Sequence, residues 1–404
     1  MSAFYIRKAY SKRWGLLNEY FCLRAVMENK ETLIAAIDVG SGMTKFVIGM
    51  VRCKGKETTI DVKEQLERPI PYGVDWKTSS DGTLSEQIQE SGFKLFNEIQ
   101  ECINKWKAAT DNFIKYDVSV IAVGTEVFRK AKNGECFLKK VYTNIGLKID
   151  VISQELEARI GFLTGKAALM TLDKDILLKQ LSYDSSKDLV VYDSGGGSYQ
   201  MSWINKSAEP SCLPLSKVKL NTILKPNGLA PTLCDLLVLQ EKATTATPNP
   251  VSEETAFKLV DLLIEKYVDD EDIRQLVKIE SPTFLSIGGI NSHVRLAADI
   301  LIQLQAESHS KDSETESLLE SGTLSPPKFY SFTEESVRQA LKRICDRKDE
   351  ELERFAYYEN AEPVTYMVPK LCILLAALKG YKLPCLHWVL SCGSCFGLIL
   401  NTIT

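Results

Sequence analysis

Two glycine-containing stretches of the sequence carry an aspartate at a spacing that suits phosphate chemistry. In the first, the apolar run 33–37 leads into Asp38, and Gly40, Ser41 and Gly42 follow. Glycine lacks a Cβ, so its backbone can turn sharply and present N–H groups to an anion. An aspartate at the end of a buried strand can hold a divalent cation against a phosphate. The stretch therefore predicts a strand–turn–strand cradle for a phosphate group.

The same pattern recurs in the second half of the chain. The apolar run 189–192 leads into Asp193, and after one serine come Gly195, Gly196, Gly197 and Ser198. The alternating residues 199–204 predict a returning strand. A tight hairpin in a purely structural sheet would have a similar sequence, so either turn alone proves little. The repetition predicts two related lobes with a ligand between them.

Three further segments place polar residues after expected strands. Gly288 and Gly289 lie between a strand and a helical run, and the strand 118–123 leads into a turn that opens a helix over residues 124–133. The strand 149–152 ends at Ser153, a residue type that caps helices. Glu157 then falls near the start of a helix, where the dipole favours acids. From the residues alone, a surface acid is the simpler interpretation of Glu157.

Composition limits the function classes. The 404 residues are 45% hydrophobic and 25% charged, with a net charge of −4, so the overall charge does not favour a partner such as nucleic acid or an anionic membrane. No apolar run is long enough to span a membrane. Eleven cysteines without framework spacing predict a reduced, cytoplasmic protein, and three histidines argue against a histidine-rich metal site.

Strands alternating with helices predict an α/β fold of two lobes, with ligand sites at the carboxyl ends of strands. Apolar residues at three- and four-residue steps predict helices over 84–107, 253–267, 333–345 and 368–378. We expect a disordered leader over 1–26, an N-terminal lobe over 27–160 and a C-terminal lobe over 161–404. The Ser-, Glu- and Pro-containing stretch near 306–327 predicts a mobile loop.

The glycine turns, their order and their spacing resemble the Ppx/GppA phosphatase family, the exopolyphosphatases and guanosine pentaphosphate phosphohydrolases. The resemblance covers roughly residues 31–400. The family's first loop usually reads D-x-G-S-N-S and corresponds to 38–43, and its second usually reads D-x-G-G-G-S-x-E and corresponds to 193–200. The family's G-T/A-T-x-x-x-R-x-A-x-N element is seen here within 124–133, and its S-x-x-E-E-A-R-like element within 153–159. The resemblance implies the actin-like, ribonuclease H-like fold shared with sugar kinases and Hsp70.

The resemblance also implies roles for individual residues. Glu157 would be the base that activates water, and Arg129 a cation for phosphate oxygens. Asp193, Asp38 and Gln200 would surround Mg²⁺. The substrate would contact the three glycine turns, which comprise Gly40, Ser41, Gly42, Gly195, Gly196, Gly197, Ser198, Gly288 and Gly289, together with Thr125.

The sequence thus predicts a Mg²⁺-dependent phosphohydrolase that removes the terminal phosphate from polyphosphate or guanosine pentaphosphate. The chain departs from the family pattern where Gly42 replaces Asn and Gln200 replaces Glu. These departures favour an alternative, a phosphate- or nucleotide-binding sensor whose metal site has decayed. An ATP-dependent kinase of the same superfold fits the loops but leaves the element at 153–159 unexplained. Family members often pair, so the resemblance implies a homodimer as one assembly state.

Overall fold

A computed structural model describes residues 31–54, 57–108, 110–111, 114–115, 117–172, 181, 188–195, 198–204, 220–226, 247–290, 292–309, 328–353 and 364–403. The predicted leader and positions 310–327 of the predicted loop lie outside these residues, as do Gly196 and Gly197. The described residues up to Thr171, together with 394–403, form one compact unit. Those from 172 to 393 form a second unit.

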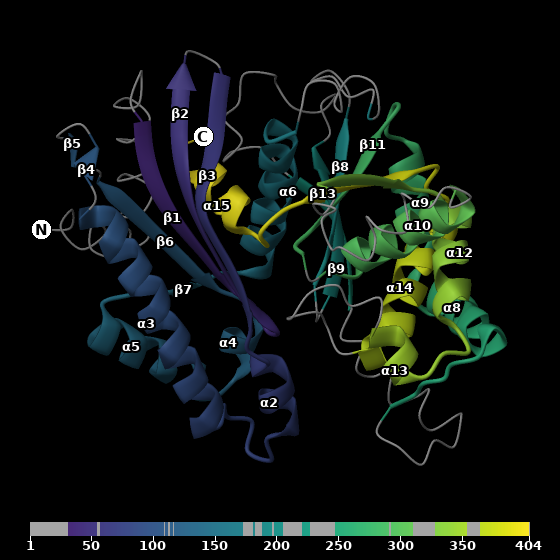
Figure 1. Cartoon of the computed structure of the whole chain (residues 1–404), viewed down its shortest axis with the longest axis horizontal. Coiled ribbons are helices and arrows are strands. Elements are labelled where there is room, and N and C mark those ends of the chain that lie inside the picture. Colours follow the sequence, from purple (N-terminus) through teal and green to yellow (C-terminus); the bar gives the residue numbers. More distant parts are fainter. Residues whose placement is uncertain are drawn as a thin grey trace, which may run out of the picture. The chain divides into compact units, whose positions relative to one another are not determined.

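The first unit is built on a five-stranded sheet with the order β3-β2-β1-β6-β7. The strands β1, β2 and β3 are antiparallel neighbours, whereas β1, β6 and β7 run parallel (Figure 1). Its strands are β1 (Glu31–Val39), β2 (Met43–Lys54), β3 (Glu57–Pro69), β6 (Val118–Gly124) and β7 (Asp150–Val151), with the small pair β4 (Thr110–Asp111) and β5 (Ile114–Lys115) apart from them. Its helices are α2 (Tyr72–Thr78), α3 (Glu86–Ala108), α4 (Glu126–Lys130), α5 (Gly134–Ile145), α6 (Gln154–Met170) and α15 (Cys395–Ile403).

Helices cover both faces of this sheet. Leu33, Ala35 and Ile37 of β1 pack in one core with the apolar side of α3. On the other face, α15 packs against β1 and β2, and α6 packs against β3. Ile34 and Ala36 point to that second face and are equally buried. A strand buried on both faces reads as a continuous apolar run, which is why the sequence around Asp38 lacks a clear alternation.

The second unit repeats this plan in a six-stranded sheet with the order β10-β9-β8-β11-β13-β12. An antiparallel trio, β8, β9 and β10, again precedes parallel neighbours, β11 and β13. Its strands are β8 (Leu189–Ser194), β9 (Ser198–Ile204), β10 (Leu220–Pro226), β11 (Thr283–Gly288), β12 (Phe329–Phe332) and β13 (Leu386–Leu390). Its helices are α8 (Glu253–Tyr267), α9 (Asp270–Val277), α10 (His293–His309), α12 (Glu334–Ile344), α13 (Asp349–Leu352) and α14 (Met367–Gly380), with the 3₁₀ turn η4 (Val364–Tyr366) before α14.

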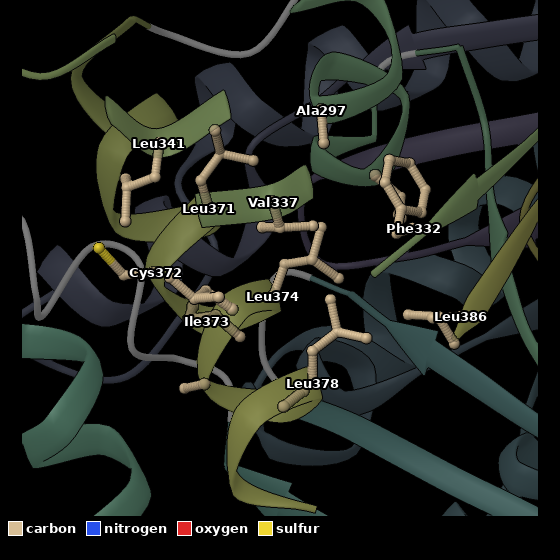
Figure 2. Packing of buried hydrophobic residues seen from close by; sticks show 14 of the residues in the cluster. Ala297, Phe332, Val337, Leu341, Leu371, Cys372, Ile373, Leu374, Leu378 and Leu386 are labelled. Atoms are coloured by element: carbon tan, nitrogen blue, oxygen red, sulfur yellow. The ribbon is translucent and has the colours of Figure 1, made fainter. Parts of the chain in front are cut away.

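The core of the second unit is organised around α14. Figure 2 shows Leu371, Leu374 and Leu378 of this helix gathered with Val337 of α12 and Phe332 of β12. All five side chains are within 1% of complete burial. Almost every residue of α14 is buried, so the helix predicted over 368–378 is a core helix. In the described part of the chain, no helix combines the length and apolarity that a bilayer crossing requires.

The helices expected over 84–107, 253–267, 333–345 and 368–378 are present with small shifts of their ends, whereas the segment 124–133 contains only the short helix α4 before α5 begins at Gly134. Ser252 accepts a hydrogen bond from the Thr255 N–H and starts α8 at Glu253, as expected for a serine cap. The expected strand over 149–152 is only the two residues of β7. Because α10 continues to His309, residues 306–309 are helical where the composition predicted the start of a loop. The repeated trio of antiparallel strands confirms two related α/β sheets.

The two compact units divide the chain differently from the predicted boundary after residue 160. That boundary falls inside α6, which belongs wholly to the first unit. The last helix, α15, also belongs to the first unit, although it ends the chain. The physical reason is packing, because α15 lies directly against α6, β1 and β2.

Burial of His293 in the second unit predicts a loss of stability in acid. The side chain is 4% exposed, and Nε2 has no hydrogen-bond partner among the described residues. Burial, with help from the charge of Lys370, lowers the pKa of His293 from 6.5 to about 3. The unfolded chain therefore binds a proton between pH 6.5 and 3 that the folded chain does not, so the free energy of unfolding falls as the pH drops below 6.5.

We expect this residue to remove about 2 kcal/mol of stability between pH 7 and pH 5. The measurement is urea unfolding at both pH values for the wild-type protein and for His293→Gln. The glutamine variant should lose less stability over this interval, whatever its stability at pH 7. Equal losses in the two proteins would contradict the expectation.

Candidate active site

The register of the first sheet brings three predicted segments to one edge. Val39 at the end of β1 lies opposite Gly124 of β6, and Gly124 lies opposite Val151 of β7. These strands are parallel, so the residues that follow them emerge at the same edge. The structure therefore gathers the first glycine loop, the segment from Thr125 to Arg129, and the start of α6.

Arg129 and Glu157, the two predicted catalytic residues, form an ion pair. The Arg129 Nη2 atom lies 3.0 Å from Glu157 Oε2, and each side chain is 25% exposed. Arg129 Nη1 also donates to the carbonyl of Ile152, at 2.6 Å. The guanidinium thus joins the end of β7 to the first turn of α6. Glu157 is not an isolated surface acid, because a fixed arginine orients its carboxylate.

Local sequence explains where α6 begins. Ser153 has an extended backbone, and its hydroxyl accepts a hydrogen bond from the Leu156 N–H at 3.2 Å. This is the serine cap that the sequence predicted. The cap sets the first turn of the helix and places Glu157 there.

The first glycine loop is a tight hairpin turn whose backbone is largely engaged. The N–H of Gly40 donates to the Met43 carbonyl at 2.9 Å, so this predicted phosphate donor is used within the turn. The carbonyls of Ser41 and Gly42 accept from Gly73 and Ile70, respectively. A Cβ placed on Gly42 would meet no atom within 4 Å. Packing around the Cβ position therefore does not require glycine here.

Thr125 lies at the end of β6 and is 7% exposed. Its N–H and hydroxyl both point to the carbonyl of Val39, at 3.2 and 3.4 Å. The residue thus ties the start of α4 to the end of β1. The predicted contact between Thr125 and substrate stays a prediction, and in the structure its N–H and hydroxyl are both directed to the last residue of β1, Val39.

Asp38 is buried beside the first loop, with 7% exposure. Its Oδ2 atom accepts a hydrogen bond from the backbone N–H of Ser394 at 2.9 Å. Its Oδ1 atom is buried without a hydrogen-bond partner among the described residues. A buried carboxylate oxygen without a partner is costly, and a bound cation would satisfy it.

Lys45 and Glu67 were missed by the sequence reasoning. The register places Lys45 opposite Asp38 and Glu67 opposite Lys45, and directly opposite residues share one face of the sheet. Glu67 is 6% exposed. The signal was a lysine two residues after the turn that connects β1 and β2, which a hairpin register would have paired with the aspartate. A row of alternating charges therefore borders the first loop.

Asp193 lies at the end of β8 in the second unit. Gln200 of β9 lies opposite it in the register, and Gln200 Nε2 approaches Asp193 Oδ2 at 3.4 Å. Gln200 is 7% exposed. The two residues predicted to surround a metal thus contact each other, with an amide donor facing the carboxylate. Burial raises the pKa of the neighbouring Tyr192 and Tyr199 phenols, so both are neutral.

The third glycine turn connects β11 to α10 in the same unit. Ile287 lies opposite Asp193, so Gly288 and Gly289 follow at the same edge of the sheet. The Gly288 carbonyl accepts from Trp388 Nε1 at 3.1 Å. The Gly289 carbonyl accepts from the Ser292 hydroxyl at 2.8 Å. Gly195 follows β8, whereas Gly196, Gly197 and the side chain of Ser198 lie outside the described residues.

The carboxylates of the candidate site could hold Mg²⁺ as one or two protein ligands, but not as a complete protein cage. Within the described ranges, no group of three or more His, Cys, Asp or Glu side chains could hold a metal ion. Magnesium is commonly held by one or two carboxylates, with waters and substrate phosphates completing the shell. Asp38, whose Oδ1 atom has no hydrogen-bond partner among the described residues, and Asp193, whose Oδ2 atom faces the Gln200 amide, each supply one such carboxylate.

Comparison with known proteins places the chain. The Ppx/GppA phosphatase family model matches residues 76–228. Over 168 residues, the chain is 26% identical to a bifunctional 3-dehydroquinate synthase/phosphatase of Fusobacterium nucleatum. This match spans 41% of this chain and 22% of that protein. Over 127 residues it is 28% identical to retrograde regulation protein 2 of Saccharomyces cerevisiae, 30% of this chain and 19% of that protein. The chain therefore spans about a fifth of the length of these curated relatives.

Solved structures of the family share the fold over almost the whole chain. A Ppx/GppA family member from Aquifex aeolicus has a TM-score of 0.59 at 20% identity, covering 93% of this chain and 98% of its own. An exopolyphosphatase from Cytophaga hutchinsonii has a TM-score of 0.59 at 14% identity, with coverage of 92% and 99%. The resemblance predicted from the motifs is confirmed: the chain is similar to the Ppx/GppA phosphatase family, matching its sequence model over residues 76–228 and sharing the fold of its solved members.

Proposed function

We propose that the protein is a Mg²⁺-dependent phosphohydrolase that removes the terminal phosphate of a phosphoanhydride, either polyphosphate or guanosine pentaphosphate. The observation that carries the proposal is the ion pair between Arg129 and Glu157 beside the first glycine loop. Arg129 and Glu157 belong to two motif elements that the Ppx/GppA family shares and that sugar kinases lack. The phosphatase description of the matching family model supports the same class of reaction.

In this mechanism Glu157 takes the proton from the attacking water. Phosphoryl transfer to water requires positioning, charge neutralisation and a base, with no covalent nucleophile. Arg129 holds the Glu157 carboxylate through Nη2 and is itself anchored through Nη1 to Ile152. A guanidinium has five donors, so those outside these two bonds can contact phosphate oxygens.

Asp38 of the first unit and Asp193 of the second unit are each proposed as a Mg²⁺ ligand, directly or through water. When bound, Mg²⁺ neutralises charge on the phosphoryl oxygens. Asp38 would offer its Oδ1 atom, because Oδ2 is held by the Ser394 N–H. Asp193 would act with Gln200, whose amide contacts it.

A second candidate function, a binding sensor without turnover, is favoured by one observation. The Gln200 amide donates toward the Asp193 carboxylate. An amide donor partly occupies an oxygen that a metal would need, and it contributes no negative charge. A site with this substitution could bind a phosphorylated ligand while hydrolysing it slowly.

Phosphate release by the purified full chain distinguishes the two functions. Medium-chain polyphosphate, guanosine pentaphosphate and ATP are offered separately, each with Mg²⁺ or with EDTA. Magnesium-dependent release from one of the first two substrates supports the hydrolase and identifies its substrate. Binding of either ligand without release supports the sensor, and release from ATP only in the presence of a sugar would indicate a kinase.

A further inference from the structure

The C-terminal helix α15 touches two parts of the proposed active site within the first unit. At its start, the Ser394 N–H donates to Asp38 Oδ2 at 2.9 Å. This bond leaves the other carboxylate oxygen, Oδ1, without a partner among the described residues. The helix therefore fixes which Asp38 oxygen is available to a ligand, even though 356 positions separate the two residues along the chain.

Three residues later, α15 meets the helix that carries Glu157. The Gly397 N–H donates to the Thr164 hydroxyl at 3.0 Å, and that hydroxyl donates to the Ile160 carbonyl at 2.9 Å. A Cβ on Gly397 would lie 2.0 Å from the Ile160 carbonyl oxygen. Only glycine permits so close an approach. The two helix backbones are therefore in direct contact, joined through one fully buried hydroxyl.

These contacts form a continuous connection from Asp38 to Glu157. Ser394 and Gly397 lie in one turn of backbone, closed by the hydrogen bond from the Leu398 N–H to the Ser394 carbonyl. Ile160 lies three residues after Glu157 on the same helix face. On the sheet side, α15 packs against Gly49 of β2. A Cβ placed on Gly49 would lie 2.9 Å from the Cδ1 atom of Ile399 in α15. The position of α15 is thus set from both the sheet and α6.

We propose that α15 is a positioning element that fixes the Asp38 carboxylate relative to Glu157, with Thr164 as the positioning residue that links the two helices. This inference rests on the proposed function for its catalytic consequence, and the structural coupling itself does not depend on turnover. In this proposal Thr164 touches neither substrate nor metal. It influences Asp38 indirectly, by accepting the hydrogen bond from the Gly397 N–H of α15.

The test compares Thr164→Val, which removes the hydroxyl at nearly constant volume, with Thr164→Ser, which keeps it. Thr402→Val is the matched control. Like Thr164, Thr402 is buried, and its hydroxyl donates to a backbone carbonyl, that of Ile399. Unlike the Thr164 contacts, this bond stays within α15. The first readout is hydrogen exchange by mass spectrometry on peptides covering 391–400 and 154–165 in the full chain. The second is kcat and KM for phosphate release on the substrate identified above.

We expect Thr164→Val to increase exchange at least tenfold in the peptide that contains Ser394, and to lower kcat at least tenfold with KM changed less than threefold. Thr164→Ser should restore both values to within threefold of the wild type, and Thr402→Val should stay within twofold. Asp38→Ala provides a reciprocal test from the other end, because it should increase exchange in the peptide over 154–165.

Two results would overturn the inference. One is unchanged exchange around Ser394 in Thr164→Val. The other is a loss of exchange protection with kcat within twofold of the wild type, which would make the contact structural only. If the wild-type protein released no phosphate, the proposed function would fail. The exchange experiment would still decide whether Thr164 and Asp38 are coupled.

Discussion

Replacement of Glu157 by glutamine is expected to lower the rate of phosphate release by about 10²- to 10⁴-fold, the range that a general base contributes. Glutamine has the same shape but cannot accept the proton of the attacking water. Its amide oxygen can still accept from Arg129, so the connection to Ile152 and the start of α6 should persist. The measurement is steady-state phosphate release, together with binding of tripolyphosphate in EDTA.

The matched control is Glu155→Gln. Glu155 lies in the same first turn of α6 and is exposed. Its replacement removes the same charge from the helix start without touching Arg129. The control should keep turnover within about twofold, since surface substitutions away from such contacts have small effects. Unchanged turnover in Glu157→Gln would remove this residue from the mechanism.

Replacement of Asp193 by asparagine is expected to raise the Mg²⁺ concentration needed for half-maximal activity by about 10- to 100-fold or more, since even the outer partners of metal ligands contribute that much to affinity. Asparagine keeps the hydrogen-bonding shape at the end of β8 and removes the charge. The measurement is a Mg²⁺ titration of phosphate release with the melting temperature recorded in parallel. An Asp193→Asn protein with normal metal activation would refute the assignment.

Gln200→Glu is the companion variant, and its effects should have the opposite sign. In EDTA, a second carboxylate at the position of the Gln200 amide, 3.4 Å from Asp193 Oδ2, would repel that oxygen and lower the melting temperature. Mg²⁺ should restore the melting temperature and activate the enzyme at a lower concentration than in the wild type. A melting temperature that does not respond to Mg²⁺ would place the metal elsewhere.

Local sequence was sufficient for the turns and for most helix ends. The spacing of aspartates and glycines predicted both hairpins, and serine caps at Ser153 and Ser252 marked the starts of α6 and α8. These features depend on residues within a few positions of each other. The order of the same motifs also carried the family resemblance, which the family model over residues 76–228 bears out.

The motif pattern did not predict which backbone N–H groups and hydroxyls remain available to a ligand. The Gly40 N–H, expected to face a phosphate, is used by the Met43 carbonyl. The Thr125 hydroxyl is directed to Val39. A motif fixes which residues are present, but competing backbone acceptors decide which donors remain for a ligand.

The sequence by itself determined that this protein has two α/β units with glycine turns at strand ends, because strand and turn signals are local. Only the tertiary structure decided which distant groups meet. Parallel pairing of β1, β6 and β7 brought Arg129 to Glu157, and antiparallel pairing placed Lys45 beside Asp38. The return of α15 to the first unit brought the Ser394 N–H to the same aspartate. Such contacts follow from sheet register and helix packing over hundreds of residues, which no local pattern encodes.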